Sequence, residues 1–146
     1  MTGANTITSP PIERKRPKLV WVITVFYVIS AGWTLLSFAL IYSGITPLNA
    51  AQVAYFKSQT ILDTFFTIII GALNFVGAIF LFSLMRTAFH LFLSAFILSI
   101  LMTAYHIFSK NWLAAIGGPG LIGAIIGWAI SVAVILYTRR LIKHYI

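Results

Sequence analysis

The sequence predicts an all-α, polytopic membrane protein with four transmembrane helices in an up-down bundle. Hydrophobic residues make up 60% of the 146 residues and charged residues only 8%, about a third of the charged share in an average soluble domain. Four apolar stretches are each long enough to cross a bilayer, which takes about 20 residues. These stretches are continuous, without the alternation that is typical of membrane β-strands.

The first elements are a tail and a span. Residues 1–18 are polar, basic and contain prolines, and we expect a disordered cytoplasmic tail. Residues 19–42 carry no charge and predict the first span. This stretch is too long for the apolar core of a cleaved signal peptide, so we expect it to be retained.

The connection at 43–63 is the only long one. Thr46 and Pro47 are residue types that favour the N-cap and the first position of a helix. From there, residues 47–63 form either an interfacial amphipathic helix or an extension of the second span. We favour the extension, because nothing between Val53 and Phe82 breaks a helix strongly.

The remaining spans are predicted at 64–85, 87–109 and 117–138. Only Arg86 separates the second span from the third, so these two form an antiparallel hairpin. The cluster Gly117-Gly118-Pro119-Gly120 marks the start of the fourth span or a short re-entrant break before it. Residues 139–146 predict a basic cytoplasmic tail.

Positive charge predicts the orientation. Eight of the ten lysines and arginines fall on one side of this topology, and only Lys57 and Lys110 fall on the other. Such an excess marks the cytoplasmic side, so both termini are expected in the cytoplasm and the protein in a bacterial inner membrane. The eight can also contact anionic lipid headgroups; because they flank spans, nucleic acid is not an expected partner. They are Arg14, Lys15, Arg16, Lys18, Arg86, Arg139, Arg140 and Lys143.

A polar seam is predicted between the second and third spans. One face of the second carries Asp63, Thr67 and Asn74. One face of the third carries Ser99, Thr103 and His106. Counted from the hairpin, the depths match, so we expect an Asn74–Ser99 contact near mid-membrane and an Asp63–His106 pair near the outer surface.

The seam has two interpretations. An ionisable group within a span usually has a role, and a histidine titrates near neutral pH. Asp63 and His106 would then form a proton-linked or ligand-binding site open to the outer side. The alternative is hydrogen bonding between helices, worth about 0.6 kcal/mol on average. We favour this alternative, because Asp63 lies at the edge of its span.

The fourth span carries small residues at four-residue spacing: Gly120, Gly123, Gly127 and Ser131. This pattern lets helix backbones approach closely. We favour packing within the bundle, with homodimerisation as the alternative. The indole groups of Trp33 and Trp128 are expected to face the bundle interior, where the N–H groups find partners.

Catalytic and cofactor sites are not expected. The chain has no cysteine, which excludes disulfides and thiolate ligands. His90 and His106 lie about 24 Å apart along one helix and cannot share a metal or a haem. Neither the phosphate-binding glycine loop nor the serine and zinc hydrolase motifs occur, so we predict that the protein is not an enzyme.

Several short motifs resemble those of a widespread group of small four-span bacterial inner-membrane proteins. They are Arg16-Pro17, Pro47-Leu48 with Gln52 and Tyr55, Leu84-Met85-Arg86-Thr87-Ala88, and Arg139-Arg140. The likeness covers most of 16–140 and implies a four-helix inner-membrane protein without implying an activity. In that group the hairpin usually carries more than one basic residue, whereas here Arg86 stands alone.

Three functions fit these features. The first is a non-enzymatic accessory or interaction subunit, which works through a membrane-protein partner or a second copy. The second is an oligomeric channel or transporter for a small solute or proton, which would use the polar seam. The third is an immunity protein against a pore-forming toxin, which rests on composition alone. We favour the first.

Overall fold

The computed structural model describes residues 17–145, and this part of the chain contains five helices and no strand. They are α1 (Lys18–Tyr42), α2 (Ala50–Ser58), α3 (Ile61–Phe82), α4 (Thr87–Lys110) and α5 (Trp112–Tyr145). All but α2 are long and apolar enough to cross a membrane. The predicted all-α, four-span fold is confirmed. The tail expected at 1–18 lies outside the described residues except for Pro17 and Lys18, which begins α1.

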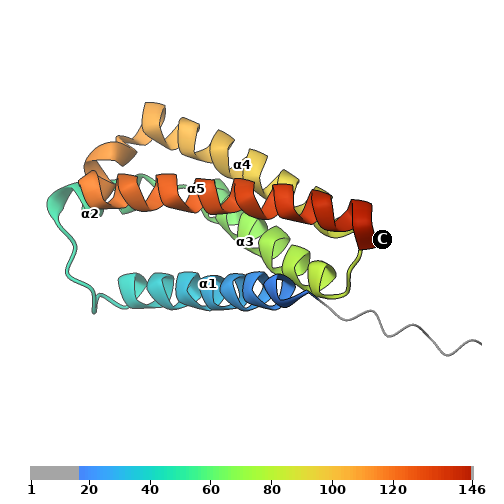
Figure 1. Cartoon of the computed structure of the whole chain (residues 1–146). Helices are drawn as coiled ribbons and strands as arrows, with labels where there is room; N and C mark the ends of the chain where they lie inside the picture. The colour runs from blue at the N-terminus through green and yellow to red at the C-terminus, as the bar shows by residue number, and fades with distance from the viewer. Residues whose placement is uncertain (1–16, 146) are drawn as a thin grey trace, which may run out of the picture.

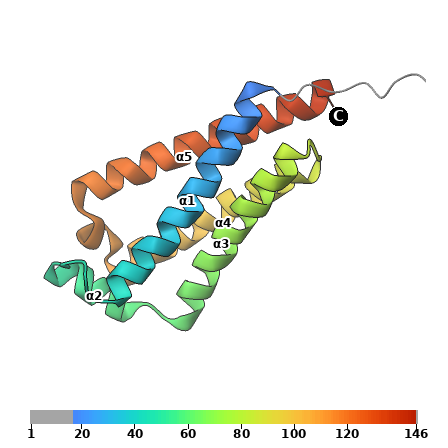
Figure 2. The same ribbon diagram turned by 90° about the horizontal axis from the view of Figure 1, so that it is seen from below.

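The four long helices form an open bundle (Figures 1 and 2). The most extensive contact joins α3 to α4, while α1 packs mainly on α3 and α5 mainly on α4. The start of α1, the α3–α4 turn and the end of α5 lie together, at what we call the basic end. The other end, where α2 lies, is called the α2 end. Since α1 and α5 share few contacts, they flank the open side of the bundle.

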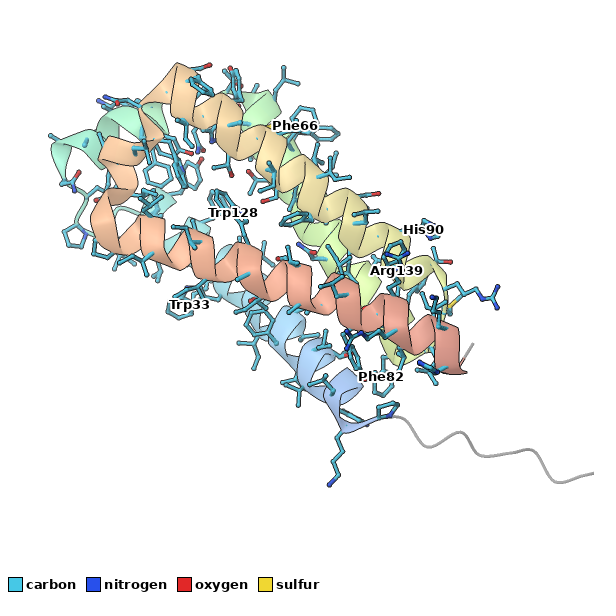
Figure 3. The ribbon with its side chains drawn as sticks, turned by 45° about the horizontal axis from the view of Figure 1, so that its top comes forward. Trp33, Phe66, Phe82, His90, Trp128 and Arg139 are labelled. Atoms are coloured by element: carbon cyan, nitrogen blue, oxygen red, sulfur yellow. The ribbon has the colours of Figure 1, made fainter. Side chains whose placement is uncertain are left out.

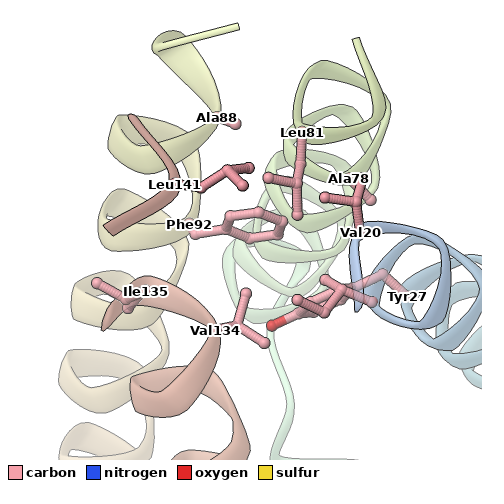
Figure 4. Close-up of a cluster of buried hydrophobic side chains, with 10 residues drawn as sticks. Val20, Tyr27, Ala78, Leu81, Ala88, Phe92, Val134, Ile135 and Leu141 are labelled. Atoms are coloured by element: carbon pink, nitrogen blue, oxygen red, sulfur yellow. The ribbon is translucent and has the colours of Figure 1, made fainter. Parts of the chain in front are cut away.

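The hydrophobic core lies at the basic end (Figure 4). It joins Val20 of α1, Leu81 of α3, Phe92 of α4 and Leu141 of α5, all at most 4% exposed. Gly77 lets α3 approach α4, because a Cβ there would lie 3.2 Å from the Phe92 ring. Tight packing therefore closes this end, and the helices separate toward the α2 end.

The long connection forms a separate helix, which corrects two expectations. Thr46 and Pro47 precede the helix, and Asn49 is the N-cap, paired with Gln52 in a capping box. The helix α2 then ends at Ser58, and Thr60 is the N-cap of α3. The expected extension of the second span is wrong because this second cap satisfies the first backbone N–H groups of a new helix.

The other connections lie where the sequence predicts them, and they differ from the prediction only in local geometry. In the hairpin turn Leu84 has a φ of 55°, and Asn111 ends α4 with a φ of 53°. The glycine-proline cluster is a kink: Gly117 departs from helical geometry inside α5. The stretch expected as a basic tail, 139–146, continues α5 as helix to Tyr145.

Large apolar side chains cover the outside of the bundle. Leu35 is 70% exposed and Phe108 88%, as expected for surfaces that face lipid chains. Trp33 is also turned outward, 68% exposed, whereas Trp128 points between the helices (Figure 3). The expectation that both indoles face the interior therefore holds for Trp128 and is wrong for Trp33.

Candidate functional site

The Asp63 carboxylate is the centre of a polar cluster at the α2 end. Its Oδ2 accepts the backbone N–H of Thr60 at 2.6 Å and the Thr60 hydroxyl at 2.8 Å. In return, the Thr60 Oγ1 accepts the Asp63 N–H at 3.4 Å. Asp63 is therefore part of the capping box that starts α3, and it is only 3% exposed.

His106 connects this carboxylate to α2. Its Nε2 lies 3.3 Å from Asp63 Oδ1, and its Nδ1 lies 2.8 Å from the Tyr55 hydroxyl. A neutral His106 can donate from Nε2 and accept at Nδ1; when protonated it donates from both nitrogens. The ring therefore joins α4 to α3 through Nε2 and to α2 through Nδ1.

Lys110 supplies the balancing charge. Its Nζ pairs with Asp63 Oδ2 and donates to the backbone carbonyl of Ser58 at 2.8 Å. Its side chain is 6% exposed. One ammonium thus ties the end of α2, the start of α3 and the end of α4 together. We call Tyr55, Ser58, Thr60, Asp63, His106 and Lys110 the junction network.

The network is electrically neutral when His106 is neutral, because the Asp63 and Lys110 charges cancel. Burial, and to a lesser extent the charge of Asp63, raises the pKa of the Tyr55 hydroxyl above its usual value near 10. Tyr55 therefore remains a hydrogen-bond donor at physiological pH.

A cavity of about 340 Å³ lies next to this network, and we call it the junction cavity. His106, Tyr55 and Gln59 line it at the α2 end. Thr67 and Thr103 line its walls, and Ser99 lines it further along α4. The two threonine hydroxyls donate to carbonyls of their own helices, at 2.9 Å each.

A second cavity, the central cavity, has about 330 Å³ and is lined by all four long helices. Ser99 lines both cavities, so they lie on either side of one residue. Trp128 projects toward the central cavity (Figure 3). The hydroxyl and amide side chains that line it are Tyr27, Ser30, Thr34, Asn74, Ser99 and Ser131.

The structure brings together most of the predicted seam. Asp63 and His106 are in contact, and Thr67, Thr103 and His106 share the junction cavity. Asn74 and Ser99 both line the central cavity, but no hydrogen bond joins them within the described residues. The expected Asn74–Ser99 contact is therefore replaced by a shared cavity wall.

Several residues of the site were not predicted. Lys110 follows His106 by four residues and so shares its helix face, but its position at a span boundary suggested a topology role only. Thr60 and Asp63 have capping-box spacing, which was a usable signal. Tyr27, Ser30 and Thr34 of α1 have i, i+3, i+7 spacing and so share one helix face, which was a second usable signal.

The small-residue stripe of α5 is largely uncovered. A Cβ added at Gly123 or Gly127 would meet nothing within 4 Å, and one at Gly120 would meet Ile116 of the same helix. Ser131 donates to the Gly127 carbonyl at 2.9 Å. No neighbouring helix of the described chain therefore packs closely against Gly123 or Gly127.

The predicted basic residues fall into two groups, those outside the described residues and those at the basic end. Arg14, Lys15 and Arg16 lie outside the described residues. Lys18 begins α1, Arg86 lies in the α3–α4 turn, and Arg139, Arg140 and Lys143 lie in the last turns of α5, all at the basic end.

His90 is exposed on α4, and residues 17–145 contain no group of three or more potential metal ligands.

No protein-family model, no curated protein and no solved structure matches the chain.

Proposed function

We propose that this protein provides a path for a small solute through part of the membrane, entered from the α2 end. The single observation that carries the proposal is the pair of polar cavities that meet at Ser99. Each has room for on the order of ten water molecules. Polar side chains at such depth are costly in lipid and usually mark a solute or ion pathway.

The path is closed at the basic end by the hydrophobic core. Tyr27 belongs both to this core and to the lining of the central cavity. Passage across the whole membrane therefore requires Tyr27 and its neighbours in the core to move apart. This arrangement supports a carrier or channel that is open toward one side.

The charge distribution supports an orientation for this path. We propose a bacterial inner membrane with the basic end in the cytoplasm and the α2 end outside, following the positive-inside rule. Under this proposal His106 and Lys110 lie at the external entrance, and solute enters from outside the cell.

Cysteine labelling tests the path. The chain has no native cysteine, so Ser99→Cys can be labelled in intact membranes with a membrane-impermeant thiol reagent. Ser94→Cys is the matched control, because Ser94 is exposed on the outside of the same helix. We expect Ser99→Cys to react from the α2 side and Ser94→Cys to remain unlabelled in lipid. Labelling of neither position would contradict a water-filled path.

A second function, as an accessory subunit or homodimer, is favoured by the uncovered face of α5. Of the 18 residues that form the apolar part of α5, 6% are buried, against 17% of the corresponding residues in each other long helix. Gly123 has room for a partner helix at short distance, whereas the open space at Gly127 belongs to the central cavity. Native mass spectrometry of protein extracted gently from its own membrane tests this function. A bound larger protein or a dimer would support it, and a monomer would count against it.

A further inference from the structure

The central cavity contains polar groups but no charge. None of its lining residues is acidic, basic or a histidine. Asp63 and Lys110 line neither cavity, and their charges neutralise each other in the junction network. An ion that entered the central cavity would lose water without gaining an opposite charge, which is strongly unfavourable.

Three polar side chains of this cavity lack a protein partner. Within the described residues, the Asn74 amide and the Ser30 and Ser99 hydroxyls make no side-chain hydrogen bond to the protein, and no buried side-chain N or O atom is left unsatisfied, so these three groups are open to the cavity. They come from three different helices and line one space. At membrane depth such groups cost free energy until water or a ligand satisfies them.

The set of unpaired groups is mixed. Asn74 offers two N–H donors and one carbonyl acceptor, and each serine hydroxyl both donates and accepts. A cation site needs converging oxygens or a carboxylate, and an anion site needs lysine, arginine or helix N-termini. The lining offers neutral hydroxyl and amide oxygens but no carboxylate, lysine or arginine. A solute that donates and accepts several hydrogen bonds fits this lining best.

We propose that the central cavity binds small uncharged solutes with several donors and acceptors, of the size and chemistry of glycerol or urea. This inference rests on the proposed path and names the class of solute that the path takes. Asn74, Ser30 and Ser99 replace hydration water of the solute. The aromatic groups of Tyr27 and Trp128 form the apolar walls against its carbon skeleton.

Solute flux into proteoliposomes tests the class. Wild-type protein is compared with empty liposomes for glycerol and urea by light scattering, and for K⁺ and Cl⁻ by ion-sensitive dyes. We expect wild type to raise the permeability to glycerol or urea several-fold and to leave the ion permeability at the level of empty liposomes. Asn74→Leu keeps the branched shape and the number of side-chain heavy atoms but removes the amide, and should lower the solute flux about tenfold, which is the effect of one or two lost hydrogen bonds.

Val76→Leu is the control, because Val76 is 38% exposed and lines neither of the two cavities; its flux should stay within about twofold of wild type. Ser99→Ala is a milder second variant that keeps the test valid should Asn74→Leu misfold. Flux of ions without glycerol or urea would overturn this inference and leave the proposed path standing. Flux of neither class would overturn both, and equal solute flux in wild type, Asn74→Leu and Ser99→Ala would remove the central cavity as the binding site.

Discussion

The Asp63 carboxylate combines two tasks that are usually separate. It closes the capping box of α3 through Thr60, and it neutralises Lys110. His106 then bonds to the remaining oxygen, so both carboxylate oxygens are occupied. Asp63 therefore stabilises the junction of three helices whether or not the junction also serves solute entry.

Replacing Asp63 by Asn should cost about 3 kcal/mol in free energy of unfolding, because the Lys110 ammonium is left buried without an opposite charge. The capping oxygen is retained in this variant. Adding Lys110→Met removes the unpaired charge and should restore most of the loss. Unfolding of the single and double variants in mixed micelles measures both effects, and a double variant no more stable than Asp63→Asn would refute the charge argument.

Gly77 and Gly71 provide a matched pair on α3. A Cβ at Gly77 would press on Phe92 and Leu91, whereas one at Gly71 meets nothing within 4 Å. Gly77→Ala should therefore destabilise the protein by about 1–3 kcal/mol through overpacking. Gly71→Ala should be neutral or stabilising by up to about 1 kcal/mol, because alanine favours helix. Thermal unfolding in detergent ranks them, and the reverse order would disprove the close α3–α4 approach.

At the scale of elements, α2 packs against α5, and two hydrogen bonds join it to α4. Tyr55 reaches His106, and the Ser58 carbonyl accepts Lys110. The rest of α2 has no buried residue. The hydroxyl of Tyr55 is thus a main tether between this short helix and α4.

Tyr55→Phe should loosen α2 while the long helices stay intact. Amide hydrogen exchange over Ala50–Ser58 is expected to speed up about fivefold, as for the loss of one hydrogen bond worth roughly 1 kcal/mol. Exchange in α4 around Phe92 should not change. Unaltered exchange in α2 would show that Tyr55 does not hold it.

The elements also show what a sequence can and cannot predict. Long apolar stretches and the short hairpin predict the four spans. A backbone that crosses lipid must satisfy its own hydrogen bonds, and it has few alternatives to a helix. The Asp63–His106 contact follows from counting turns along two adjacent helices. The end of α2 before α3 was not predicted, because the apolar composition of this stretch favoured one continuous helix. The capping signal against it consisted of only two residues, Thr60 and Asp63. The α1 wall of the central cavity escaped because its rotation depends on tertiary packing.

At the scale of the whole molecule, packing is unequal along the bundle axis. The core joins all four long helices at the basic end, and the cavities occupy the part where the helices separate. In the proposed path, polar access from the α2 end and an apolar seal at the basic end both follow from this divergence. The central proposal is that the path opens toward one side only.

Side-specific labelling along α5 tests this claim most directly. Ser131 lines the central cavity, and Thr138, two turns further on, is 0% exposed beside the core. In sealed vesicles of known orientation, we predict that Ser131→Cys reacts with an impermeant thiol reagent added at the α2 end and that Thr138→Cys reacts from neither side. Labelling of Thr138→Cys, or of Ser131→Cys only from the basic end, would contradict the account.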